Sequence, residues 1–152
     1  MLTFRMAQRK DCALILSFIK ELAEYENMAE CVKASEEKLE YWLFDRVLAR
    51  VLFAVEDGVE IGFALYFYNY STFTGSGGIH LEDLFIKEEK RHKGYGTALI
   101  KELARMAERE NFGRMEWVCF NNNKKGIGFY LSIGAEQMLD ITTYRLADDT
   151  LF

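Results

Sequence analysis

The sequence predicts one α/β (α+β) domain with a mixed central sheet and helices on both faces of that sheet. Alternating apolar and polar residues mark about seven strands, and apolar residues spaced three and four apart mark the helices between them. Hairpins and helical crossovers both occur along the chain, so the sheet should hold antiparallel and parallel pairs. The 152 residues contain no linker or internal repeat, which favours a single domain over residues 1–152.

The composition indicates a folded, acidic protein of the cytoplasm. Half of the residues are hydrophobic and 14% are aromatic, which is enough for a core. The net charge of −5 argues against nucleic acid and an anionic membrane as partners, and no apolar run is long enough to span a membrane. Cys12, Cys31 and Cys119 lack C-x-x-C spacing, so we expect neither a disulfide framework nor a metal site.

The first third of the chain predicts one strand and two helices. Residues 2–6 alternate as a short strand, and apolar residues four apart predict an amphipathic helix over residues 11–26. Ser35 is followed by two glutamates, which is typical of a helix N-terminus.

A hairpin and four later segments are predicted in the rest of the chain, besides the strand described next. Residues 51–56 and 60–70 flank an Asp-Gly pair, the commonest sequence of a two-residue hairpin turn. The later segments predict a long helix, a strand, a weaker helix and a closing hairpin, over residues 95–110, 115–120, 124–132 and 135–147 in that order.

The strand predicted over residues 79–87 changes phase partway along. Its apolar residues occupy odd positions before Glu82 and even positions after Asp83. A β-bulge, which inserts one extra residue, would produce this change. A central strand buried on both faces, which Phe85 favours, explains the pattern equally well at this point.

Residues 91–96 read R-x-x-G-x-G and stand between this strand and the long helix. The first turn of a helix has unpaired backbone N–H groups and a favourable dipole, so a glycine loop there can bind a phosphate. Gly94 and Gly96 would let such an anion approach the backbone closely. Neither the Walker A pattern nor the third glycine of the dinucleotide pattern is present.

With this loop in this position, the sequence resembles the GCN5-related N-acetyltransferases (GNAT), and among them the diamine (spermidine/spermine and thialysine) branch. The resemblance spans nearly the whole chain and is carried by KELAEYE, LEDLFI, RHKGYGTALIKELA and GFYLSIGA, at residues 20–26, 81–86, 91–104 and 128–135. It implies the GNAT fold with a bulged, splayed fourth strand, which favours the bulge. It also implies an enzyme that moves the acetyl group of acetyl-CoA to the primary amine of a small cationic substrate by direct attack on the thioester.

The resemblance further implies the residues of the site. Glu82 would be the base and Tyr130 the proton donor to the coenzyme sulfur, although an exposed strand glutamate and a packed helix aromatic are the alternatives. The amine would be bound by Tyr25, Glu26, Glu82 and Asp83. The cofactor would be bound by Leu84, Phe85, Ile86, Arg91, His92, Lys93, Gly94, Tyr95, Gly96, Thr97 and Asn123.

Some features limit what the resemblance implies. Thr142 stands where the diamine branch carries a further acidic residue, so short amines are favoured over long polyamines. His80 and His92 lack the partners of a catalytic triad, so each is interpreted as a strand or loop residue rather than the activator of a nucleophile. A homodimer is the family expectation. A protein or peptide N-acetyltransferase and a non-catalytic acyl-CoA-binding domain are the alternative functions.

Overall fold

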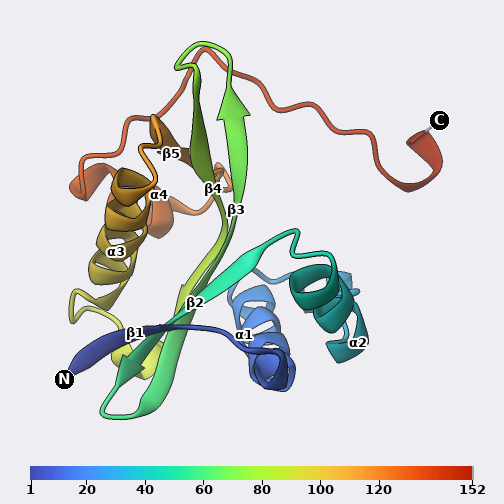
Figure 1. Cartoon of the computed structure of the whole chain (residues 1–152), viewed down its shortest axis with the longest axis vertical. Helices are drawn as coiled ribbons and strands as arrows, with labels where there is room; N and C mark the ends of the chain where they lie inside the picture. The colour runs from blue at the N-terminus through green and yellow to red at the C-terminus, as the bar shows by residue number, and fades with distance from the viewer. Residues whose placement is uncertain (152) are drawn as a thin grey trace. The chain divides into compact units, whose positions relative to one another are not determined.

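The computed structural model describes residues 1–151 and divides the chain into two compact units, Met1–Val118 and Cys119–Phe152. The last residue of the predicted 1–152 domain lies outside the described residues. Figure 1 follows the chain through both units.

The first unit is built on a five-stranded sheet. Its strands are β1 (Leu2–Met6), β2 (Arg50–Glu56), β3 (Val59–Ser71), β4 (Ser76–Ile86) and β5 (Arg114–Glu116), which lie side by side in this order. The first three pairings are antiparallel and the last is parallel. The predicted mixed sheet is therefore confirmed, with five strands in place of about seven. Asp57 and Gly58 form the predicted hairpin turn with φ angles of 51° and 82°.

The helices lie close to the predicted ranges. They are α1 (Cys12–Tyr25), α2 (Glu36–Leu39), α3 (Tyr95–Arg109) and α4 (Lys124–Ser132). A six-residue π-helix, Glu40–Asp45, continues α2. Short 3-10 turns occupy Arg9–Asp11, Ala29–Cys31, Glu88–Lys90 and Asp148–Thr150. The Ser35 hydroxyl accepts a hydrogen bond of 3.2 Å from the N–H of Lys38, so the predicted helix start is confirmed.

Two hydrophobic clusters lie on opposite faces of this sheet, as predicted. Phe18 of α1 is fully buried and stacks on Phe63 with ring centroids 5.5 Å apart. On the other face, Leu99 and Leu103 of α3 pack in a second cluster with Ile79. Figure 1 shows α1 and α3 on the two sides of the sheet.

The strand register confirms the bulge in β4. Leu65 of β3 faces Asp83, whereas the next residue, Tyr66, faces Leu81, so Glu82 is the extra residue without a partner. Because of this insertion Leu81 and Leu84 both pack in the α3-side cluster, while Phe85 packs on the α1 side. A strand buried on both faces without a bulge is therefore excluded.

The pairing between β4 and β5 is short. It involves only Gly78–His80 of β4 and Arg114–Glu116 of β5. Among the strands of the described chain, none pairs with this side of β4 beyond His80. The two strands thus separate next to the bulge, as the splayed fourth strand of the prediction requires.

The closing hairpin predicted over residues 135–147 is wrong. The structure gives no strand there, and β5 also ends earlier than the predicted strand of residues 115–120. An isolated two-stranded hairpin is marginal, because one pair of strands buries little apolar surface. Leu139 and Tyr144 are 84% and 90% exposed, so the alternation of this segment is not matched by burial.

Candidate functional site

The glycine loop leads from β4 into α3 in the geometry of an anion site. Gly94 is the N-cap residue of α3 and has a φ of 80°, in the left-handed region that glycine adopts without strain. His92 also has a positive φ, of 61°. A Cβ atom on Gly94 would meet no atom within 4 Å, so open space lies over this point of the loop.

The first turn of α3 presents backbone donors. The N–H of Ala98 donates to the carbonyl of Gly94 over 2.9 Å, closing the first turn. The N–H groups of Tyr95, Gly96 and Thr97 therefore precede the intrahelical hydrogen bonds, and α3 adds the dipole of a 15-residue helix. Donors of this kind fit the phosphate oxygens of a nucleotide cofactor.

Glu56, the last residue of β2, stabilises the glycine loop through side-chain hydrogen bonds. Its carboxylate accepts hydrogen bonds from the Lys90 ammonium and from the Tyr95 hydroxyl. The hydrogen bonds from Lys90 and Tyr95 lower the pKa of Glu56. The hydrogen bond between Glu56 and Lys90 also raises the pKa of Lys90. The Tyr95 hydroxyl is thus used within the protein, which leaves the backbone of Tyr95 for a ligand.

Arg91, the first residue of the motif, joins the loop to α1. Its guanidinium lies 4.7 Å from the ring centroid of Tyr25 and 5.3 Å from that of Phe85. Its Nε donates to the carbonyl of Ile86 over 2.9 Å. The predicted cofactor residue Arg91 therefore contacts the predicted substrate residue Tyr25, and the two halves of the predicted site adjoin.

The predicted substrate residues form an acidic cluster at the bulge. Asp83 is partly buried, and burial, together with the charges of Glu82 and Glu26, raises its pKa to about 6. Burial also raises the pKa of Glu26, which follows the last residue of α1. Glu82 is more accessible, with 57% of its side chain exposed. A bound cation would relieve the repulsion among these carboxylates.

The predicted cofactor residues of β4 differ in exposure. Phe85 and Ile86 are buried, with 6% and 8% of their surface accessible, and Leu84 is partly buried. Phe85 contributes its ring to the α1-side cluster, 6.1 Å from that of Phe18. A ligand beside this strand would therefore contact its backbone more than these side chains.

Two predicted residues belong to the second unit. The side-chain oxygen of Asn123 caps α4 by accepting the Gly126 N–H over 3.0 Å. Asn123 thus has a structural role as the N-cap of α4. Tyr130 lies on α4 and is partly buried, with its ring centroid 5.3 Å from that of Phe129.

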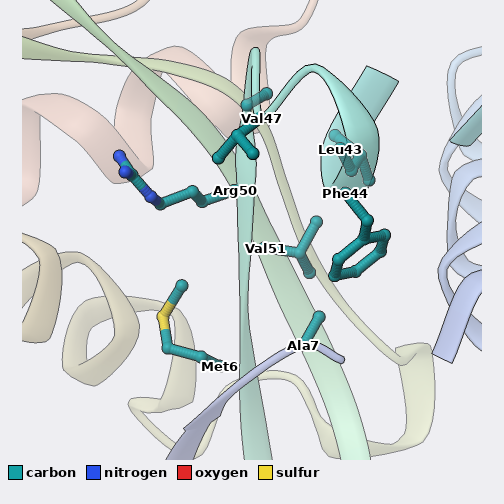
Figure 2. A pocket seen from close by; sticks show the side chains of 8 residues that line it. Met6, Ala7, Leu43, Phe44, Val47, Arg50 and Val51 are labelled. Atoms are coloured by element: carbon teal, nitrogen blue, oxygen red, sulfur yellow. The ribbon is translucent and has the colours of Figure 1, made fainter. Parts of the chain in front are cut away.

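A hollow of about 210 Å³ opens in another part of the first unit. It is lined by Met6, Ala7, Leu43, Phe44, Val47, Ala49, Arg50 and Val51. Figure 2 shows Arg50 pointing away from Val51 and Phe44, and its guanidinium lies 4.6 Å over the Tyr68 ring. The lining includes no predicted site residue and no carboxylate or imidazole, so this hollow is distinct from the candidate site.

Among the side chains that the structure describes within residues 1–151, no three of His, Cys, Asp or Glu are grouped so that they could hold a metal ion. Among the helices of that same range, none has the length and apolar character needed to cross a membrane.

Comparison with known proteins identifies the fold and its chemistry. Residues 16–135 match the acetyltransferase (GNAT) family. The chain belongs to this family. The GNAT protein is 35% identical to a thialysine N-epsilon-acetyltransferase from Sus scrofa over 145 residues, which are 90% of this chain and 85% of that protein. The predicted family and its diamine and thialysine branch are thereby confirmed.

Two further relatives support this assignment. An L-ornithine N5-acetyltransferase from Arabidopsis thaliana is 36% identical over 97 residues, 64% of this chain and 42% of that protein. A solved integron cassette protein from V. cholerae superposes on the GNAT chain with a TM-score of 0.82 and 29% identity, covering 99% of this chain and 94% of that one. The predicted fold class is confirmed, and the chain is an N-acetyltransferase.

Two contacts beside the predicted site residues of this GNAT chain did not follow from the sequence. Glu56 lies 34 positions before Lys90, and no local pattern marks it as a support of the loop. His80 was interpreted as a strand or loop residue without the partners of a catalytic triad; it lies on β4, where its Nε2 is 3.6 Å from a carboxylate oxygen of Glu82. For the contact of His80 with Glu82, the phase change in β4 was the available signal, because a bulge at residue 82 changes which side chains of the strand lie next to each other.

Proposed function

We propose that this GNAT acetyltransferase transfers the acetyl group of acetyl-CoA to the primary amine of a small cationic substrate, such as a diamine, a polyamine or thialysine. The observation that carries the proposal is the contact of Arg91 with Tyr25, which joins the anion-binding loop to the acidic cluster. A cofactor pyrophosphate and a cationic acceptor would thus bind at adjoining places. The names of the thialysine and ornithine acetyltransferase relatives support the same class of acceptor.

The family match also supports one catalytic domain. It runs from residue 16 to residue 135 and so crosses the boundary between Val118 and Cys119. We therefore treat residues 1–152 as a single N-acetyltransferase domain to which both units contribute. The family resemblance further supports a cytoplasmic homodimer.

Acetyl-CoA is the proposed co-substrate, and the residues of the loop fit it. The backbone N–H groups of residues 92–97 would bind the pyrophosphate, with the charge of Lys93 beside them. Leu84 and Ile86 would pair with the pantetheine arm through their backbone, along the side of β4 that β5 leaves after His80. Asn123 is assigned to the cofactor by the family resemblance. The cofactor supplies a thioester carbonyl.

The acidic cluster would bind the amine as its ammonium ion. Glu26, Asp83 and Glu82 provide the negative charge, and the exposed ring of Tyr25 provides an aromatic surface for a cation. A primary amine with a pKa of about 10 is neutral in about one molecule per thousand at pH 7, so deprotonation costs roughly 4 kcal/mol. A base at the site is therefore required.

Glu82 is the proposed base, because the bulge removes it from strand pairing and leaves its side chain accessible. After the neutral amine attacks the carbonyl carbon, a backbone N–H near Leu84 or Phe85 would stabilise the oxyanion. Tyr130 is the proposed donor of a proton to the departing thiolate. Thr142, in place of an acidic residue, favours short amines.

A thiol-release assay with acetyl-CoA tests this function. The panel contains thialysine, ornithine, a short diamine, spermidine, and a peptide with a free N-terminus. We expect release with the small amines and little with the peptide. Release with the peptide alone would assign a peptide N-acetyltransferase, and acetyl-CoA binding without release from any acceptor would assign a non-catalytic acyl-CoA-binding domain.

A further inference from the structure

His80 lies beside the proposed base in a fixed orientation. Its ring stacks on Phe67 with centroids 4.8 Å apart and planes inclined by 24°. Phe67 and His80 are partners in the β3–β4 register, so the backbone sets this stack. The side chain is 23% exposed, and Nε2 points to within 3.6 Å of a Glu82 oxygen. The imidazole is thus held with its nitrogen edge toward Glu82.

The charges around His80 in the first unit are mostly acidic. Glu82 and Asp83 follow it on β4, and Glu26 adds its charge to theirs from the end of α1. On β5, Glu116 is the register partner of His80, and Arg114 pairs with Glu116 over 3.1 Å. His80 therefore has carboxylates beside it both on its own strand and on the neighbouring strand.

We propose that His80 takes the substrate proton from Glu82 and releases it to solvent. This inference rests on the proposed function, because it concerns the ammonium ion that the acidic cluster would bind. His80 does not touch the amine; it acts through Glu82, and so it is a positioning residue that also relays a proton. The structure supports the pairing through the Glu82 contact and the Phe67 stack together.

The relay balances in protons and charge. The ammonium gives one proton to the Glu82 carboxylate, Glu82 gives it to Nε2 of His80, and His80 gives it to water. The neutral amine then forms the new C–N bond while the C–S bond breaks. The second proton lost by the nitrogen is matched by the one that the thiolate gains, so each turnover releases one proton.

An imidazole is the better intermediate acceptor on general grounds. Reference pKa values are about 4.3 for glutamic acid, about 6.5 for imidazole and about 10 for a primary ammonium. The pKa of imidazole is thus closer to that of the ammonium than the pKa of a carboxylic acid is, by about two units. Proton transfer from an ammonium to an imidazole is therefore about 10²-fold more favourable in equilibrium than transfer to a carboxylate. The imidazole would therefore speed the passage of the proton from Glu82 to water, without changing the equilibrium between the ammonium and the neutral amine.

Substitution of His80 with chemical rescue tests the relay. His80→Phe keeps a ring on Phe67 and removes both nitrogens, so kcat is expected to fall about tenfold or more, with the Kd of acetyl-CoA and the KM of the amine nearly unchanged. Imidazole added to His80→Ala should restore kcat in proportion to its concentration. The matched control is Glu82→Gln, in which added imidazole should restore nothing, because the first acceptor is missing.

The outcomes separate this inference from the proposed function. A pH profile alone would not do so, since Asp83 titrates in the same range as an imidazole. If the parent is active and His80→Phe has the same kcat, the relay alone is overturned. The relay is also overturned if His80→Ala loses kcat and added imidazole does not restore it. A parent that releases no thiol with any amine overturns both.

Discussion

Asp83→Asn is expected to stabilise the protein at neutral pH while weakening its use of amines. Burial and neighbouring charges raise the pKa of Asp83 from 3.8 to about 6. The ionised form is therefore disfavoured in the folded state, by about 1.4 kcal/mol for each pKa unit. The shift of about two units corresponds to about 3 kcal/mol, which is an upper value because the side chain is only partly buried.

The sign of the pH dependence follows from this shift. Above pH 6 Asp83 is charged in both the folded and unfolded states, and the full penalty applies. As the pH falls from about 6 to about 3.8, the folded protein binds its proton first, so the penalty decreases and then vanishes. The Asn variant, which carries no charge, should gain stability only in the upper range.

Thermal unfolding at several pH values measures the effect. A gain of about 1 to 3 kcal/mol predicts a Tm about 3 to 10 °C higher at pH 7.5 for a chain of this length, with the two proteins converging near pH 3.8. A short diamine should raise the Tm of the parent more than that of Asp83→Asn, because the cation pairs with the carboxylate. An Asn variant no more stable than the parent at pH 7.5 would refute the reasoning.

Three further predictions concern the loop, its support and the second unit. Gly94→Glu should abolish acetyl-CoA binding in a folded protein, whereas Gly94→Asn, which tolerates a positive φ, should keep more of it; calorimetry that finds equal affinities would contradict the loop assignment. Glu56→Gln should weaken acetyl-CoA binding several-fold by releasing Lys90 and Tyr95, and a matched Asp57→Asn change in the adjacent turn should not. Tyr130→Phe should lower kcat by about 10²-fold with the acetyl-CoA Kd unchanged, and parental kcat where chemistry limits the rate would remove Tyr130 from the mechanism.

Local patterns were sufficient for most elements of the first unit. The spacing of apolar residues predicted α1 and α3, and the Asp-Gly pair predicted the hairpin. The phase change allowed the bulge at Glu82, which the family resemblance then favoured. Each of these depends on neighbours a few positions away. The sequence pattern failed over residues 135–147, where alternation is necessary for a strand but a partner strand is also required.

The candidate site was predictable to a smaller extent. The loop was marked as an anion site by its glycines and its place before a helix, whereas its cofactor and the role of the acidic residues were implied by a family resemblance. The supporting contacts did not follow from the sequence. The bond of Glu56 to Lys90 and the approach of His80 to Glu82 depend on strand register and on one inserted residue, which no composition or spacing specifies.

The bulge also has a consequence for how this enzyme could diversify. Glu82 is the one residue of β4 that has no partner on β3, so a substitution there would change the proposed base without altering strand pairing. Deleting the residue would instead reverse the facing of every later side chain of β4, and Leu84 would leave its cluster. The core thus constrains the number of residues in β4, whereas the side chain at position 82 can change without disturbing the core.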